Sequence, residues 1–187
     1  MVAYTFFFTE LNPFSQWYPC TFTVGAHTFS CAEQYMMYGK AMLFADAAVA
    51  AEVLAAAHPR DHKALGRKVK PYDEAVWRAH RLQIVKAGNH AKFTQNAELL
   101  AQLRATRDTL LVEASPYDKI WGIGLAATDP RAQDPAQWKG QNLLGKVLTE
   151  LRDELLTTGQ GGWSSALQVG HHTVALNEPR RKQRKQT

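Results

Sequence analysis

Apolar residues along the chain recur mostly at helical spacing, with a few short runs of extended character. Aromatic and β-branched runs predict strands at residues 4–8, 22–24, 27–29 and 109–113. Helical spacing predicts helices at residues 30–46, 46–57, 60–69, 71–92, 95–103 and 142–156. Strands and helices do not alternate regularly, which argues against a doubly wound sheet. The pattern therefore predicts an α+β fold, a predominantly helical single domain with a few short strands.

Turn-forming residues mark the connections between these elements. Gly25-Ala26 separates two extended runs and suits a type II′ hairpin turn, because glycine tolerates the required positive φ. Prolines mark a loop over residues 10–19, and residues 127–139 form a polar loop. We expect a domain over residues 1–158 and a C-terminal extension, 159–187, that ends in a basic, flexible tail.

Charge is distributed unevenly along the 187 residues. The net charge is +5, and the ten residues from Glu178 hold five basic and one acidic side chain, a net of +4, which leaves +1 for the rest. A basic tail can add salt-sensitive affinity for nucleic acid, but it is more often a solvated end. The high isoelectric point therefore does not by itself indicate DNA binding.

Composition narrows the class of protein. Apolar residues make up 45% of the chain, but no run approaches the roughly 18 apolar residues of a membrane span. Cys20 and Cys31 have no metal-ligand spacing, and neither do the histidines. We expect a cytoplasmic protein in a reducing compartment, with no metal and no cofactor.

One predicted helix carries an unusual stripe. Glu33, Met37, Lys40 and Phe44 share a face at helical spacing, which sets an acid and an amine two turns apart on an otherwise apolar surface. A simpler explanation exists for each charge. Ser30 and Glu33 have the spacing of a capping box, and a lone lysine is usually solvated.

Ordered sequence blocks resemble the signature of the NADAR family, also called YbiA-like, over roughly residues 4–156. The blocks are Cys31-Ala32-Glu33-Gln34-Tyr35-Met36-Met37 with Lys40-Ala41, Gly66-Arg67, Trp77, Lys92-Phe93, Glu113-Ala114-Ser115-Pro116-Tyr117-Asp118, Ile120-Trp121-Gly122-Ile123-Gly124, and Trp138, Gly140, Asn142 and Leu144-Gly145. The first loop matches through Asn12 and Ser15, but it has Gln16-Trp17 where the family has Asn followed by Phe or Trp.

The resemblance implies an N-glycosidase, a hydrolase that removes ADP-ribose from a base, with guanine in nucleic acid expected. Two alternatives remain: hydrolysis of phosphoribosylamino-pyrimidine intermediates of the riboflavin pathway, as damage control, and a non-catalytic ADP-ribose-binding module. The expected partners are an ADP-ribose or ribosyl-phosphate nucleotide and ADP-ribosylated nucleic acid, without a membrane or an obligate protein partner. Intact Glu33 and Lys40 argue against the module, because a reader needs neither.

The same resemblance implies the site residues. Glu33 would be the acid/base, Lys40 an imine-forming nucleophile or a phosphate ligand, and Asp118 a group that orients the sugar or stabilises charge. The substrate-binding residues would be Asn12, Ser15, Tyr35, Arg67, Trp77, Trp121, Gly122, Gly140 and Asn142. Simpler roles are a turn for Asp118 and core packing for the tryptophans. Arg67 would bind a diphosphate, and free N–H groups at Gly140 and Asn142 would favour an anion.

Overall fold

Two strands from distant parts of the chain form a parallel pair at the centre of the fold. In the computed structural model, which describes residues 2–157, β1 (Ala3–Phe7) pairs with β4 (Thr109–Glu113), with Phe7 opposite Glu113. A separate antiparallel hairpin joins β2 (Phe22–Val24) to β3 (His27–Phe29). Gly25 has a φ of +59° in its turn, as the predicted type II′ turn requires.

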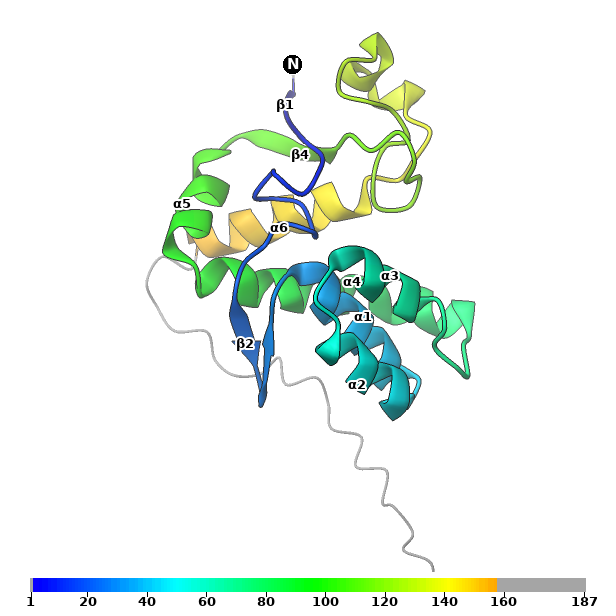
Figure 1. The fold of residues 1–187 in the computed structure, drawn as a ribbon. Helices are drawn as coiled ribbons and strands as arrows, with labels where there is room; N and C mark the ends of the chain where they lie inside the picture. Colours follow the sequence, from blue (N-terminus) through cyan, green and yellow to red (C-terminus); the bar gives the residue numbers. More distant parts are fainter. Residues whose placement is uncertain (1, 158–187) are drawn as a thin grey trace, which may run out of the picture. The chain divides into compact units, whose positions relative to one another are not determined.

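Residues 2–157 also form six helices, most of which lie on one side of the β1–β4 pair (Figure 1). They are α1 (Ala32–Leu43), α2 (Ala47–Ala55), α3 (Pro59–Gly66), α4 (Glu74–Thr94), α5 (Ala97–Ala105) and α6 (Leu143–Thr157). The predicted α+β class, with helices dominant, is confirmed. The predicted polar loop holds two short 3₁₀ helices, η1 (Pro130–Gln133) and η2 (Pro135–Gln137). The proposed extension, 159–187, lies outside the described residues.

Several helix boundaries differ from the sequence predictions by two or three residues. α1 begins at Ala32 rather than Ser30, and α4 begins at Glu74 rather than Pro71. The start of α4 is set by Asp73, whose side chain accepts a hydrogen bond from the Val76 N–H at 2.9 Å.

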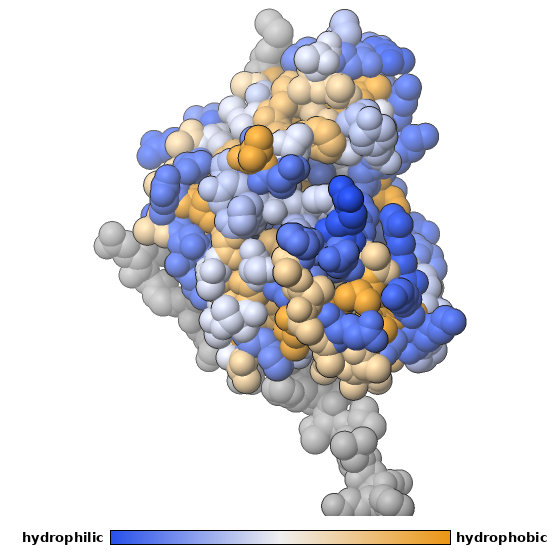
Figure 2. Space-filling view, in the orientation of Figure 1, coloured by the Kyte–Doolittle hydropathy of each residue, from blue (hydrophilic) through white to orange (hydrophobic). Residues whose placement is uncertain are grey.

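The main core lies where α4 and α6 meet the β1–β4 pair. Phe7, Phe93, Leu111, Leu148 and Leu151 are fully or almost fully buried in it. Large apolar residues that remain exposed are dispersed, and on the face drawn in Figure 2 hydrophilic and apolar side chains are interspersed.

Asn142 ties the last helix to the central strand. It is fully buried, its Oδ1 accepts the Glu113 N–H at 3.0 Å, and its Nδ2 donates to the Leu111 carbonyl at 3.0 Å. Its φ of +52° is one that asparagine tolerates better than most residues. This side chain therefore completes the hydrogen bonding of β4 on the side opposite β1.

Replacing Asn142 with alanine should lower the free energy of unfolding by about 2–4 kcal/mol, because it leaves a buried N–H and a buried carbonyl unpaired. Urea denaturation measures the loss. Asn142→Gly is the matched control, since it loses the same hydrogen bonds but accepts the positive φ, and it should be less destabilised than Asn142→Ala. A loss below about 0.5 kcal/mol in both variants would contradict this role.

Candidate active site

Glu33 lies in the first turn of α1 and is held there by the first loop. Its backbone N–H donates to the Gln16 carbonyl at 2.9 Å, and the residue is only 6% exposed. The loop is itself fixed from α4. Lys92 donates its Nζ to the Ser15 carbonyl at 2.8 Å, and Asn89 donates to Gln16 Oε1 at 2.8 Å. Buried polar contacts therefore hold both the loop and the start of α1.

The expected capping box does not form. Gln34, not Glu33, reaches back to Ser30, whose N–H donates to Gln34 Oε1 at 2.8 Å. The residue at the N-cap position is Cys31, and its side chain caps nothing. The capping-box explanation of Glu33 is therefore wrong.

Three acidic side chains, Glu33, Glu113 and Asp118, interact electrostatically in this region. Burial, above all, raises the pKa of Glu33 to about 7, with the charge of Asp118 adding to the rise. Lys63, hydrogen bonding from the Trp17 side chain, and Arg67 oppose it. Burial likewise raises the pKa of Glu113 to about 8, and the charges of Asp118 and Glu33 contribute. Carboxyl groups with such pKa values can donate and accept protons near neutral pH.

Glu113 stands at the carboxyl end of β4, where its backbone is fixed on both sides. Its N–H is accepted by Asn142, and its carbonyl accepts the Ile123 N–H at 2.9 Å. Its Oε2 is buried and has no hydrogen-bond partner among residues 2–157. The end of β4 therefore carries a buried carboxyl oxygen without a hydrogen-bond partner, on which the charges of Glu33 and Asp118 act.

Asp118 has the turn role that its sequence context suggests as well as a place in the cluster. Its Oδ1 accepts the N–H groups of Ile120 and Trp121, both at 2.8 Å. Its charge acts on both Glu33 and Glu113. The turn hydrogen bonds therefore fix the carboxylate that faces the two glutamates.

Lys63 of α3 and Arg67, the residue that follows this helix, carry positive charge in the region of Glu33. The same helix also contacts α1 at Met37 and Lys40. The exposed Lys63 and Arg67 act on the charge of Glu33. Gly66 packs against Met37, since a Cβ there would lie 2.0 Å from the Met37 sulfur. Lys40 donates its Nζ to the Gly66 carbonyl at 2.7 Å. Helix α3 therefore lies along the Glu33–Met37–Lys40 stripe of α1.

Lys40 has a partly apolar environment at the other end of the stripe. Its Nζ lies 4.4 Å from the centroid of the Tyr72 ring and 5.6 Å from that of Trp77. Burial lowers the pKa of Lys40, and the charge of Glu74 partly opposes this. Two helical turns, about 10 Å, separate it along α1 from Glu33. Lys40 and Glu33 share a helix face, but their immediate neighbours differ.

The other predicted binding residues divide into two groups. Trp121 adjoins Asp118 through its N–H, and Ser15 and Asn12 belong to the loop that holds Glu33. Tyr35 instead packs against Phe22 and Phe29 in a second core cluster, on a different face of α1. The structure therefore connects Trp121 directly to Asp118 and the loop of Asn12 and Ser15 to the backbone of Glu33, and it places Tyr35 in a different cluster.

The start of α6 does not offer the free donors expected of an anion site. The N–H of Asn142 donates to the Gly122 carbonyl, that of Leu143 to Ile120, and that of Leu144 to Trp121. Gly140 permits close approach, because a Cβ there would lie 2.3 Å from the Gly122 carbonyl oxygen. The N–H of Asn142 is therefore not free for an anion, because it anchors the 118–122 turn, and the role predicted for Gly140 stays a prediction.

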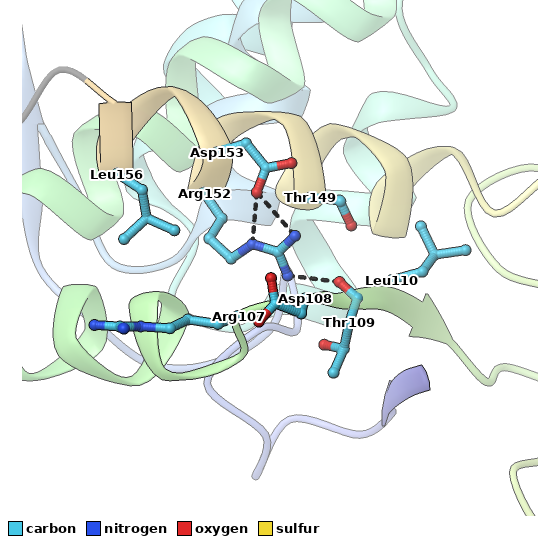
Figure 3. Close-up of a pocket in the computed structure, with 8 residues that line it drawn as sticks. All are labelled: Arg107, Asp108, Thr109, Leu110, Thr149, Arg152, Asp153 and Leu156. Atoms are coloured by element: carbon cyan, nitrogen blue, oxygen red, sulfur yellow. Dashed lines mark hydrogen bonds and ion pairs between the residues drawn. The ribbon is translucent and has the colours of Figure 1, made fainter. Parts of the chain in front are cut away.

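A cavity of about 750 Å³ lies at the opposite end of β4 (Figure 3). It includes none of the predicted site residues. Its buried Arg152 already donates to the carbonyls of Thr106 and Thr109 and pairs with Asp153. This arginine joins α6 to the α5–β4 connection, so the cavity surrounds a structural contact.

Residues 2–157 contain no cluster of three side chains that could bind a metal ion. No helix among these residues is long and apolar enough to cross a bilayer.

Sequence reasoning missed several residues of the carboxyl region. Glu113, Lys63 and Trp17 were not among the predicted site residues, yet the pKa of Glu113 is raised by the charges of Asp118 and Glu33, and Lys63 and Trp17 lower the pKa of Glu33. A signal existed for Glu113 alone: it is an acid that ends an apolar strand and alternates with the buried Val112. Lys63 and Trp17 approach only through tertiary packing.

Residues 6–156 match the family described as NADAR domain. The chain is 42% identical over 146 residues to N-glycosidase R617 of Acanthamoeba polyphaga mimivirus, which covers 75% of this chain and 86% of the relative. It is 32% identical to N-glycosidase YbiA of Escherichia coli over 78% of this chain and 82% of that one. The NMR structure of E. coli YbiA superposes with a TM-score of 0.70 at 27% identity, covering 88% and 92% of the two chains.

These matches define a class and a family. The class is that of hydrolases acting on N-glycosyl bonds, as the relatives' names state. The chain belongs to the NADAR domain family. A further relative, 30% identical over 75% of this chain, is riboflavin biosynthesis protein VVA0006 of Vibrio vulnificus, of which only 35% is covered.

The pKa of Glu113 predicts a pH-dependent stability. Its value of about 8 lies above the usual 4.5, so the folded protein binds a proton that the unfolded chain releases in this range. The resulting stability is complete below pH 4.5 and is lost as the pH rises through about 8. Glu113→Gln should therefore gain stability relative to the parent protein between pH 5 and pH 9, by about 1–3 kcal/mol.

Urea denaturation at pH 5, 7 and 9 measures this difference. Glu98→Gln, at an exposed position on α5, is the matched control and should show a constant difference from the parent. If the free energy of unfolding of Glu113→Gln differs from that of the parent by the same amount at all three pH values, Glu113 ionises normally.

Proposed function

We propose that this protein hydrolyses the N-glycosidic bond between ADP-ribose and a base, with guanine in nucleic acid as the leaving base, and so reverses ADP-ribosylation. The observation that carries the proposal is the group of three carboxyl side chains, Glu33, Glu113 and Asp118, gathered at the start of α1 and the end of β4. The N-glycosidase names of its relatives support the reaction class.

The chemistry requires the types of group that meet here. Breaking the bond at the anomeric carbon develops positive charge on the sugar, which an ionised carboxylate stabilises. The leaving base takes up a proton, which a carboxyl group with a pKa of 7 to 8 can deliver near neutral pH. Water then adds to the anomeric carbon and loses a proton to the carboxylate. Glu33 and Glu113 serve as the proton-transfer pair and Asp118 as the charge-stabilising group.

The basic residues of α3 support a phosphate-bearing substrate. Lys63 and Arg67 are exposed, and both act on the charge of Glu33. A guanidinium can bind phosphate oxygens through two parallel hydrogen bonds. We propose that Arg67 contacts the diphosphate of ADP-ribose as it enters, and that Trp121 or Trp77 stacks on a base.

A second candidate substrate is a phosphoribosylamino-pyrimidine of the riboflavin pathway. The observation that favours it is the similarity to riboflavin biosynthesis protein VVA0006. The bond broken and the carboxyl groups required would be the same, so the two candidates differ only in the leaving base and in the length of the phosphate chain.

Glu33→Gln should retain the fold and reduce turnover at least a hundredfold, because glutamine keeps the shape of the side chain but cannot transfer the proton. The assay compares the release of free ADP-ribose from ADP-ribosylated guanine DNA with the release of ribose 5-phosphate from the aminouracil nucleotide. Faster release from the DNA supports the first substrate, and faster release from the nucleotide supports the second.

Glu98→Gln, an exposed acid on α5, is the matched control and should keep full activity. Full activity in Glu33→Gln would end the proposed role of Glu33. Tight binding of ADP-ribose without turnover of either substrate would indicate a binding module. Borohydride added during turnover separates the roles of Lys40: a covalent adduct at Lys40 assigns the imine, and its absence assigns phosphate binding.

A further inference from the structure

Arg81 of α4 is a buried arginine that lacks an anionic partner. It is 7% exposed, and its Nε is buried without a hydrogen-bond partner among residues 2–157. None of the ion pairs of these residues includes it. Arg152 shows the contrast, because it is equally buried but donates to two carbonyls and pairs with Asp153.

Such a charge cannot be relieved by losing a proton. A guanidinium stays protonated at any physiological pH, and a buried charge without a partner is strongly unfavourable. The contact available to Arg81 is cation–π: its guanidinium carbon lies 5.8 Å from the centroid of the Trp121 ring. That interaction is weaker than the cost of burial. The side chain is therefore held ready for an anion from outside the chain.

Arg81 lies next to the carboxyl region, one indole ring away. The backbone N–H of Trp121 donates to Asp118 Oδ1 at 2.8 Å, so the ring that contacts Arg81 belongs to the turn that fixes Asp118. Trp121 thus contacts Arg81 through its ring and Asp118 through its backbone N–H.

A second cation and a second aromatic ring lie on the other side of Arg81. Burial and the hydrogen bond to Glu74 raise the pKa of Tyr72 to about 12, and the nearby charge of Arg81 opposes this rise. Lys40 lies over the same Tyr72 ring. Glu74, the acid of this region, accepts the hydroxyl hydrogen of Tyr72 and forms no ion pair with Arg81.

We infer that Arg81 binds the phosphate attached to the ribose of the substrate, the 5′-phosphate or the proximal phosphate of a diphosphate, while the anomeric carbon of the same ribose faces the carboxyl groups. The inference rests on the proposed function and deepens it. The 5′ phosphate and the anomeric carbon occupy opposite ends of a ribose, which suits two groups on either side of Trp121. Lys40 adds positive charge at the phosphate end.

The test is calorimetric binding of ribose 5-phosphate, ADP-ribose and unphosphorylated ribose to the whole protein at low salt. Arg81→Met should weaken binding of both phosphorylated ligands by about 10- to 100-fold, the range of a charge-assisted hydrogen-bonded pair, and leave binding of ribose unchanged. A loss for both phosphorylated ligands would assign the phosphate next to the ribose, whereas a loss for ADP-ribose alone would place Arg81 at the distal phosphate and overturn the inference.

The stability of the free protein distinguishes this role from a structural one. Without ligand, Arg81→Met should unfold at the same or a higher temperature than the parent, because it removes an unpaired buried charge. Arg107→Met, at an exposed position on the far cavity, is the matched control and should bind all ligands normally. Unchanged binding of ribose 5-phosphate by Arg81→Met, or a clear drop in its unfolding temperature, would overturn the inference.

The binding measurement tests the phosphate site separately from the proposed reaction. If the parent protein cleaves none of the proposed substrates but Arg81→Met loses affinity for ribose 5-phosphate, the phosphate site stands and the proposed reaction fails. If the parent protein cleaves a substrate and Arg81→Met binds and cleaves it equally well, the reaction stands and the phosphate site fails.

Discussion

The burial of Glu33 beside two other acidic side chains is the constraint on which the site depends. Carboxyl groups removed from water lose the solvation of their charged form, so they hold protons at a pH where exposed carboxyl groups have lost them. Here burial raises the pKa values of Glu33 and Glu113 to about 7 and about 8, the charge of Asp118 adds to both rises, and the charge of Glu33 adds to that of Glu113. Such an arrangement weakens the fold in the neutral range, and structures retain it mainly at functional sites.

Backbone hydrogen bonds, rather than ion pairs, position this cluster. Glu33 is held through its N–H by Gln16, and Glu113 through its N–H by Asn142. The 118–122 turn is fastened to the start of α6, where Gly140 allows the two segments to meet. Of the three carboxyl groups, Glu113 keeps an oxygen, Oε2, without a hydrogen-bond partner among residues 2–157, whereas Asp118 Oδ1 accepts two backbone N–H groups.

The sequence predicted the elements of the fold better than the contacts between them. Helical and extended spacing located all six helices and four strands of residues 2–157, since that spacing reflects which residues face the core. It could not show that β1 pairs with β4, because a pairing across about a hundred residues leaves no local pattern. The start of α1 was misplaced for a related reason. The Ser30–Glu33 spacing fits a local cap, but the tertiary contact with Gln16 decides the actual geometry.

In the site, too, the sequence indicated some residues, whereas others depend on tertiary contacts that it could not show. Glu33 and Asp118 could be selected by resemblance to a family signature, and the structure sets them together. Glu113 and Arg81 were missed, because an acid at the end of a strand and an arginine within a helix are ordinary in sequence. Only burial without a partner distinguishes them. Conversely, Tyr35 and Asn142 lie within the signature and yet serve the core and the backbone.

The most direct test of a proton-holding carboxyl cluster is an NMR titration of the ¹³C-labelled glutamate side chains between pH 4 and pH 10. Glu33→Gln and Glu113→Gln assign the two signals. We predict that both titrate far above the usual 4.5, near 7 and 8, and that removing the Glu33 carboxyl group lowers the pKa of Glu113. Titration of both signals near 4.5, with no effect of Glu33→Gln on the Glu113 signal, would contradict a proton-holding cluster.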